Sequence, residues 1–389
     1  MYKDLCLENM RCDTPKKQFG RSDASAIISM HAIGDAIYVM HADFTFCTYK
    51  LHHTRGDIPF HFRIDKVKAL ESKDVVFSNR TLTSEVDTSR DERQPQRNLS
   101  FAIALGVHTR AANGGSSGSD PTYLLFSCGY FDDSIKIHSL DSMQLQSKIN
   151  GVHRGRINCL EVEDEGAIMV TGGDDATCSV WIVDHDALAS AITDGFVKSS
   201  LGRDRSEETK CYHAHMLLGH VTPVCCVTMC TKLDVVLSGS LDGSICIHNI
   251  RSGKFIRALH IDAETETVQE SCARNGIPVK KLAIHSDGFF VAHFCDGSLY
   301  VISINGQQLC SANIGERLNT MIICPESETV ITGGDIGCVR VWALRDLTLR
   351  CTVDVKKNGS ITSLIRTTGS PHFLCIGSSN GMVSIVSRQ

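Results

Sequence analysis

The chain repeats one pattern along most of its length. Each copy has a short apolar run, a pair of small residues, a turn and a second, alternating run. The copies are LFSCGYFDDSIKIHSL (125–140), IMVTGGDDATCSVWIV (168–183), VVLSGSLDGSICIHNI (235–250), FFVAHFCDGSLYVISI (289–304), VITGGDIGCVRVWAL (330–344) and FLCIGSSNGMVSIVSR (373–388). Their turn positions, Asp132, Asp175, Asp242, Asp296, Ile336 and Asn380, follow at intervals of 43, 67, 54, 40 and 44 residues. A basal period of 40–45 with insertions predicts an all-β propeller with four-stranded antiparallel blades.

The copy at 168–183 shows how one repeat should fold. Gly172, Gly173 and Asp175 supply the geometry of a tight turn between two strands. Cys178, Val180 and Ile182 alternate with Trp181 and Val183, so both faces of the second strand are apolar. We expect neighbouring blades to cover both faces, as in stacked sheets.

Polar residues recur with the repeat. His153, Thr171, Asp175 and Trp181 have the types and order of the WD-repeat tetrad, and His220, Ser238, Asp242 and His248 follow the same pattern. The first and last members are 28 residues apart in both sets. We expect Asp to accept from His, His to reach the hydroxyl, and the hydroxyl to reach the indole, because buried polar groups need partners. A hydrolase triad is the alternative interpretation, but recurrence at blade period favours a structural network.

The repeats give six clear blades and one degenerate blade. Residues 26–49 contain three alternating runs without the tetrad, which makes a seven-bladed ring over residues 24–389. Gln389 follows the third strand of the last repeat. Residues 1–23 are expected to be a linker whose segment near Leu5–Cys12 supplies the missing strand and closes the ring, since closure removes exposed edges. An incomplete last blade is the competing interpretation.

Four segments are expected to be insertions or loops: 72–98, 107–121, 184–212 and 262–277. The stretch 184–197 has helical spacing, with Asp186 as a cap and Gly195 as a stop. Gly114-Gly-Ser116-Ser-Gly118 matches GxSxG, but no strand–turn–helix context surrounds it, so we expect no nucleophile there.

Composition limits the function. The net charge is −5, which does not indicate a nucleic-acid binder, and no apolar run approaches 18 residues. Eighteen cysteines contain no CxxC and lie mostly singly in apolar runs, which is typical of small buried residues in a reducing compartment. We therefore expect no metal and no cofactor.

Several stretches resemble the C-terminal WD-repeat propeller of BEACH-domain proteins of the neurobeachin type. They are Cys128-Gly-Tyr-Phe-Asp-Asp-Ser-Ile-Lys-Ile, Val236-Leu-Ser-Gly-Ser with Cys246-Ile-His248, Gly253-Lys-Phe-Ile-Arg257, Ser303-Ile-Asn-Gly-Gln307 and Thr332-Gly-Gly-Asp335 with Val341-Trp342. The resemblance covers roughly residues 24–386. It implies a cytoplasmic scaffold, peripheral on endomembranes, that acts in vesicle traffic and membrane-protein sorting. It also implies protein partners, among them BEACH and PH-like domains and, for some members, a kinase regulatory subunit.

We therefore expect a non-catalytic interaction scaffold. The alternative is a free-standing adaptor, as a ubiquitin-ligase substrate receptor or a chromatin-associated protein. An enzyme would need acids or metal ligands on the innermost strands, which offer only Glu161 and His285. The candidate partner-binding residues lie in loops between blades: Arg154, Arg156, Thr222, Glu316 and Arg317.

Overall fold

The computed structural model is built of β-strands. It describes residues 5–11, 26–33, 36–41, 46–53, 62–70, 100–106, 122–130, 133–139, 145–163, 167–184, 210–262, 267–269, 276–367 and 373–388. In this part of the chain the helical elements are two 3-10 turns, η2 (Pro325–Ser327) and η3 (Lys356–Asn358). No helix there is long and apolar enough to cross a membrane.

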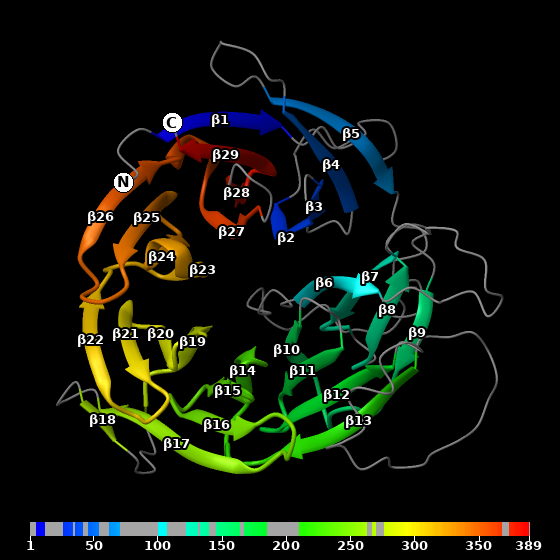
Figure 1. Cartoon of the computed structure of the whole chain (residues 1–389), viewed down its shortest axis with the longest axis vertical. Helices are drawn as coiled ribbons and strands as arrows, with labels where there is room; N and C mark the ends of the chain where they lie inside the picture. The colour runs from blue at the N-terminus through cyan, green and yellow to red at the C-terminus, as the bar shows by residue number, and fades with distance from the viewer. Residues whose placement is uncertain are drawn as a thin grey trace, which may run out of the picture.

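Seven antiparallel sheets form the blades of a ring, which confirms the propeller (Figure 1). Blade 1 contains β2 (Ile27–Ile33), β3 (Ala36–His41), β4 (Phe46–His53) and β5 (Phe62–Leu70); blade 2 contains β6 (Ser100–Gly106), β7 (Thr122–Cys128), β8 (Ile135–Ser139) and β9 (Leu145–Ile149). Blade 3 contains β10 (Ile157–Val162), β11 (Ile168–Gly173), β12 (Cys178–Asp184) and β13 (Lys210–Leu217). Blade 4 contains β14 (Val224–Cys230), β15 (Val235–Ser240), β16 (Ile245–Asn249), β17 (Phe255–Asp262) and the short β18 (Thr267–Gln269). Blade 5 contains β19 (Val279–His285), β20 (Phe289–Phe294), β21 (Ser298–Ser303) and β22 (Gln308–Asn313); blade 6 contains β23 (Leu318–Cys324), β24 (Thr329–Gly334), β25 (Cys338–Ala343) and β26 (Leu349–Asp354).

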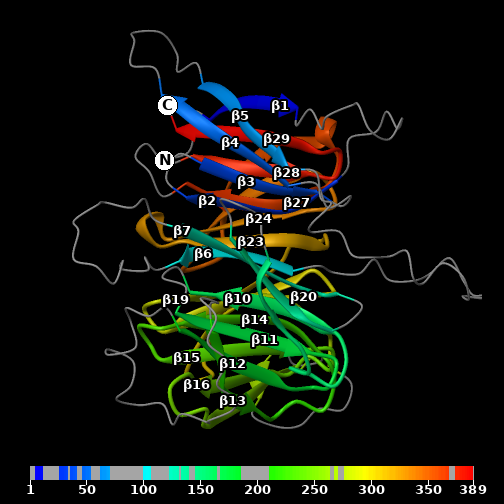
Figure 2. The same ribbon diagram turned by 90° about the vertical axis from the view of Figure 1, so that its right-hand side faces the viewer.

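Blade 7 joins the two ends of the chain. It contains β27 (Ile361–Arg366), β28 (Leu374–Ser378), β29 (Met382–Arg388) and, as its outermost strand, β1 (Leu5–Arg11). β1 pairs antiparallel with β29 from Leu5 opposite Arg388 to Arg11 opposite Met382. Figure 1 shows β1 outside β29, and Figure 2 shows the strands running across the thickness of the ring. Hydrogen bonds to the N-terminal strand thus occupy an edge of β29 that would otherwise be free.

Two of the expected insertions contain strands. Lys210–Tyr212, expected to be loop, begin β13, the outer strand of blade 3. Thr267–Gln269 form β18 and pair with residues 260–262 of β17. Their runs mix polar and apolar residues without a clear period, so no strand pattern could be recognised there. The segments 72–98 and 107–121 and the helix expected at 184–197 lie outside the described residues, except for Asp184, which ends β12.

The apolar core lies between blades. One cluster joins Phe126 and Ile137 of blade 2 to Met169, Trp181 and Val183 of blade 3. The opposite face of blade 3 belongs to another cluster, in which Val170, Cys178 and Val180 pack with Val224 of blade 4. Both faces of β12 are therefore covered by neighbouring blades, as the alternating run predicts.

Glycines in the second strand of several blades allow this close packing. A Cβ added at Gly172 would lie 2.6 Å from Val224 Cγ1, and one at Gly239 would lie 2.6 Å from Val279 Cγ1. In each pair the neighbour is the first residue of the next blade's inner strand. Adjacent blades therefore approach to a distance that a larger side chain would prevent.

Candidate interaction surface

One face of the ring carries both the loops between blades and the turns between the second and third strands of each blade. We call it the loop face; its loops are 150–156, 218–223, 276–278, 314–317 and 355–360, and its turns are 174–177, 241–244, 295–297, 335–337 and 379–381. The same backbone bond joins loop and turn in blades 3 to 7: Asp174 N–H to Arg156 O, Leu241 to Pro223, Cys295 to Pro278, Asp335 to Arg317 and Ser379 to Ser360, at 2.9–3.2 Å. These bonds hold loop and turn together in every one of these blades.

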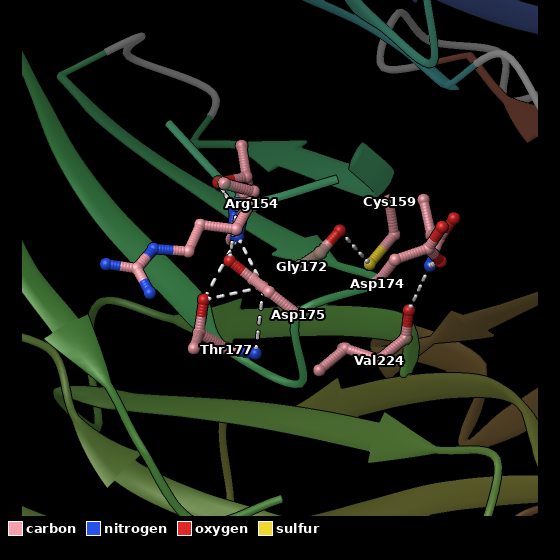
Figure 3. Close-up of polar contacts among 10 residues, drawn as sticks. Arg154, Cys159, Gly172, Asp174, Asp175, Thr177 and Val224 are labelled. Atoms are coloured by element: carbon pink, nitrogen blue, oxygen red, sulfur yellow. Dashed lines mark hydrogen bonds and ion pairs between the residues drawn. The ribbon is translucent and has the colours of Figure 1, made fainter. Parts of the chain in front are cut away.

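In blade 3 the side chains reinforce this link. His153 Nδ1 lies 3.0 Å from Asp175 Oδ1, and His153 Nε2 lies 3.0 Å from Thr171 Oγ1. Asp175 also accepts from the Arg154 N–H at 2.9 Å and the Thr177 hydroxyl at 2.8 Å (Figure 3). Burial alone would raise the pKa of Asp175, but these hydrogen bonds keep that pKa below its ordinary value. The carboxylate therefore fixes the loop that presents Arg154.

The expected contact of Trp181 is wrong. Its indole Nε1 is buried and has no hydrogen-bond partner among the described residues. Trp181 lies opposite Met169 on β11, while Thr171 lies opposite Ser179 and uses its hydroxyl to contact His153. The indole instead makes an edge contact with the His213 ring, with centroids 4.9 Å apart.

Blade 4 has a modified version of the network. His220 Nε2 lies 2.8 Å from Ser238 Oγ, but Nδ1 meets Ser244 Oγ at 2.7 Å in place of the expected Asp242. Ser244 donates in turn to Asp242 Oδ1 at 2.6 Å, so the hydroxyl relays the contact. His248 was expected to bond Ser238, and it lies instead 2.9 Å from Leu218 O through Nε2.

These sets are poorly placed for catalysis. The Ser238 side chain is fully buried, so a substrate cannot reach its hydroxyl. Burial lowers the pKa of His220 to about 4, which keeps the imidazole neutral inside the blade. No group of three His, Cys, Asp or Glu residues in the described ranges is arranged to hold a metal ion.

The side chains of Thr222 and Glu316 link loop and turn by hydrogen bonds. Both lie two residues before an inner strand, and both accept from the N–H of the equivalent turn residue. Asp242 N–H donates to Thr222 Oγ1 at 3.0 Å, and Ile336 N–H donates to Glu316 Oε2 at 3.1 Å. Glu316 is buried, so its assignment as an exposed partner-binding residue is corrected.

Blade 6 exchanges the positions of its polar groups. Its turn has Ile336 where blade 3 has Asp175, and the carboxylate comes from Glu316 in the loop. Arg340, at the position of Ser179 in blade 3, pairs with Glu316, and both side chains are largely buried. Trp342 here does donate to Thr332 Oγ1, at 2.9 Å. The departure of Ile336 from the repeat is therefore compensated by an ion pair.

The three arginines among the candidates remain on the surface. Arg154 and Arg317 are exposed, and Arg156 is partly exposed. Arg156 and Arg317 occupy equivalent positions immediately before β10 and β23. The loop face thus holds these side chains on backbone that is anchored to the blades.

The sequence analysis did not identify two asparagines that bond both to a turn and to the next blade. Asn158 Nδ2 donates to Asp174 Oδ1 at 2.8 Å and to Val224 O at 3.0 Å in the next blade. Asn319 repeats this, donating to Asp335 Oδ1 at 2.8 Å and to Ile361 O at 3.1 Å. The signal was present, because Arg-x-Asn spans the start of both inner strands and an aspartate follows 16 residues after each asparagine. Figure 3 shows Asp174 and Val224 on either side of this contact.

Comparisons with known proteins agree with this architecture. The chain is 28% identical over 266 residues to BEACH domain-containing protein B of Arabidopsis thaliana, which covers 68% of this chain and 9% of that protein. It is 23% identical over 267 residues to BEACH domain-containing protein lvsE of Dictyostelium discoideum, with 67% of this chain and 11% of that protein covered. The chain therefore matches only a small part of the length of these relatives.

Solved structures share the fold. The WD40 beta propeller domain of Doa1 superposes with a TM-score of 0.57 and 15% identity over 95% of both chains. The computationally designed Ika8 protein gives a TM-score of 0.55 and 16% identity, with 94% of this chain and 96% of that chain covered. The family described as the neurobeachin beta propeller domain matches residues 103–388. The chain belongs to the neurobeachin β-propeller family of BEACH proteins.

Proposed function

We propose that this chain is a docking platform for other proteins in vesicle traffic and membrane-protein sorting. It would act at the cytoplasmic side of endomembranes, with BEACH and PH-like domains and a kinase regulatory subunit among its partners. The observation that carries the proposal is the loop face, where exposed Arg154 and Arg317 project from loops bonded to rigid blades. Partner binding commonly uses such loops on a rigid frame.

The family favours this function over a free-standing adaptor. The curated relatives are BEACH domain-containing proteins, and the chain matches them over two-thirds of its own length. Neither their names nor the fold supports a role in ubiquitin ligation or chromatin binding. We therefore prefer the hypothesis of a docking platform in vesicle traffic to that of a free-standing adaptor.

Charge reversal on the loop face tests the proposal. The tagged chain and its Arg154→Glu/Arg317→Glu variant are expressed in cells, and the captured proteins are compared by quantitative mass spectrometry. Arg350→Glu, on the outer strand β26, is the matched control because Arg350 is also exposed. We expect sorting and coat proteins to be captured by the wild type and the control and to be lost from the double variant. Equal capture by all three proteins would refute a role for this face.

A second readout tests the membrane context. The same cells are separated by flotation on a density gradient, and the share of the chain in the membrane fraction is measured. We expect that share to fall for the double variant and not for Arg350→Glu. A chain that never enters the membrane fraction would argue against the endomembrane assignment.

A further inference from the structure

The loop face differs from blade to blade at three equivalent positions. They are the residue before the inner strand, the residue that its bulge leaves out of register, and the first residue of the turn. In blades 3 and 6 they are Arg156, Asn158, Asp174 and Arg317, Asn319, Asp335; in blades 4 and 5 they are Pro223, Cys225, Leu241 and Pro278, Lys280, Cys295. Blades 4 and 5, where these three positions are mostly apolar, thus lie between blades 3 and 6, where the same positions are polar.

The polar flanks satisfy their own hydrogen bonds. In both flanks the asparagine amide donates to the turn aspartate at 2.8 Å and to a carbonyl of the following blade. Asp174 and Asp335 are exposed, and each accepts the asparagine amide through Oδ1.

The middle of this arc exposes apolar side chains. Val221 is 84% exposed and Leu241 is 47% exposed, and Cys295 is also exposed. The bonds from Leu241 to Pro223 and from Cys295 to Pro278 place each turn against its loop. Blades 4 and 5 abut closely, since a Cβ on Gly239 would contact Val279 at 2.6 Å. We call Val221, Pro223, Leu241, Pro278 and Cys295 the apolar sector.

The inner border of the apolar sector carries a free positive charge. Lys280 lies on the bulge of β19, between Val279 opposite Phe294 and Lys281 opposite His293. No ion pair of Lys280 occurs among the described residues. Asp242 and Asp296, which accept from Ser244 and Ser298 at 2.6 Å each, form no ion pair with Lys280. The ammonium is therefore available to a carboxylate from outside.

We propose that the apolar sector binds a short segment of a partner protein in which an apolar side chain stands beside an acidic one. The apolar side chain covers Leu241 and Val221, and the carboxylate meets Lys280. Burial of exposed apolar surface supplies the affinity, and the charge fixes the orientation of the segment. This inference rests on the docking function proposed above and specifies where and what the platform binds.

A peptide library displayed on phage provides the test. Random dodecapeptides are selected on the immobilised wild-type chain, and the affinities of enriched peptides are measured by fluorescence polarisation. We expect enrichment of peptides that combine apolar and acidic residues. Leu241→Asp and Lys280→Glu should each weaken binding by about tenfold or more, the scale of one central interface contact.

Matched variants separate the sector from general effects. Leu349→Asp is the control, because Leu349 is 50% exposed and lies on the outer strand of blade 6. It should leave the affinity within about twofold, a difference well below one hot-spot contact. Leu241→Ala serves where the aspartate disturbs folding, as judged by circular dichroism. A peptide whose acid is replaced by lysine should regain affinity for Lys280→Glu.

The outcomes are distinct. Peptides that bind Leu241→Asp as well as wild type, but lose affinity for Arg154→Glu/Arg317→Glu, would overturn the sector while supporting the docking platform. Failure to enrich any peptide would overturn the sector, and the cellular capture experiment would then decide the platform independently. Concentration-dependent dimerisation that Leu241→Asp abolishes would show that a second copy occupies the sector and would also overturn the proposal.

Discussion

The two tryptophans of the chain offer a sharp test of the polar network. They lie at equivalent strand positions, Trp181 opposite Met169 and Trp342 opposite Val330. They are 6% and 8% exposed, so the loss of packing on truncation should be similar. They differ in one contact: the Trp342 indole donates to Thr332 at 2.9 Å, and the Trp181 indole has no partner among the described residues.

Replacement of each tryptophan by phenylalanine isolates that contact. Trp342→Phe removes one net hydrogen bond and leaves the Thr332 hydroxyl with a 3.5 Å contact to Arg340 O. Trp181→Phe removes a buried N–H that has no hydrogen-bond partner in the described part of the chain. We expect the free energy of unfolding to fall by about 1–2 kcal/mol more for Trp342→Phe. Both alanine variants should lose about 3–5 kcal/mol, the cost of truncating a large buried aromatic side chain.

Urea unfolding followed by far-ultraviolet circular dichroism measures these differences. Each variant retains a single tryptophan, so its fluorescence gives a second, local record of the same transition. Equal losses for the two phenylalanine variants, or a larger loss for Trp181→Phe, would refute the reasoning from the indole contacts. An unfolding midpoint unchanged in Trp181→Ala would show that Trp181 is not buried.

Three further predictions concern the blades. Burial lowers the pKa of His220 to about 4, so as the pH falls the unfolded chain takes up this proton at a higher pH than the folded chain does. The stability that neutral His220 contributes is therefore complete above about pH 6.5 and falls as the pH drops towards 4. Urea midpoints measured at several pH values should decline less in His220→Gln than in the wild type. Gly239→Ala should destabilise by about 1–3 kcal/mol through overpacking between blades, and a melting temperature equal to wild type would contradict the close approach. Arg340→Met should cost about 3–5 kcal/mol by leaving the buried Glu316 carboxylate without its ion-pair partner. Arg345→Met breaks an exposed pair and should cost far less. Chemical denaturation compares the two variants, and similar losses would argue that Glu316 is solvated.

The blade architecture followed from local sequence. The turn residues and the alternation around Asp175 and Asp242 recur at blade period, and each copy is a two-stranded unit whose pattern depends on near neighbours in the chain. The same local information located the loops that carry Arg154 and Arg317. It also placed His153 and Thr171 at positions where the structure shows them in contact.

The partners of the polar groups depended on longer distances. Glu316 looks like an exposed loop residue until Arg340, 24 residues later, is placed against it. The spacing predicts a bond between His220 and Asp242, but the Ser244 hydroxyl lies between them and contacts both. These contacts are set by side-chain directions at the loop face, which a repeat period does not specify.

The sequence by itself determined a ring of four-stranded units, because hydrophobic alternation and turn chemistry act over a few residues. The sequence left open whether a strand near Leu5–Cys12 completes the last blade, and only the tertiary structure shows β1 paired with β29 across the whole length of the chain. Only it showed that Lys280 lies on the bulge of β19 and that the turn residue Leu241 is bonded to Pro223 in the loop before β14. The reason is physical: periodicity selects a strand and its faces, whereas the packing of one blade against the next selects which side chains meet and which remain free.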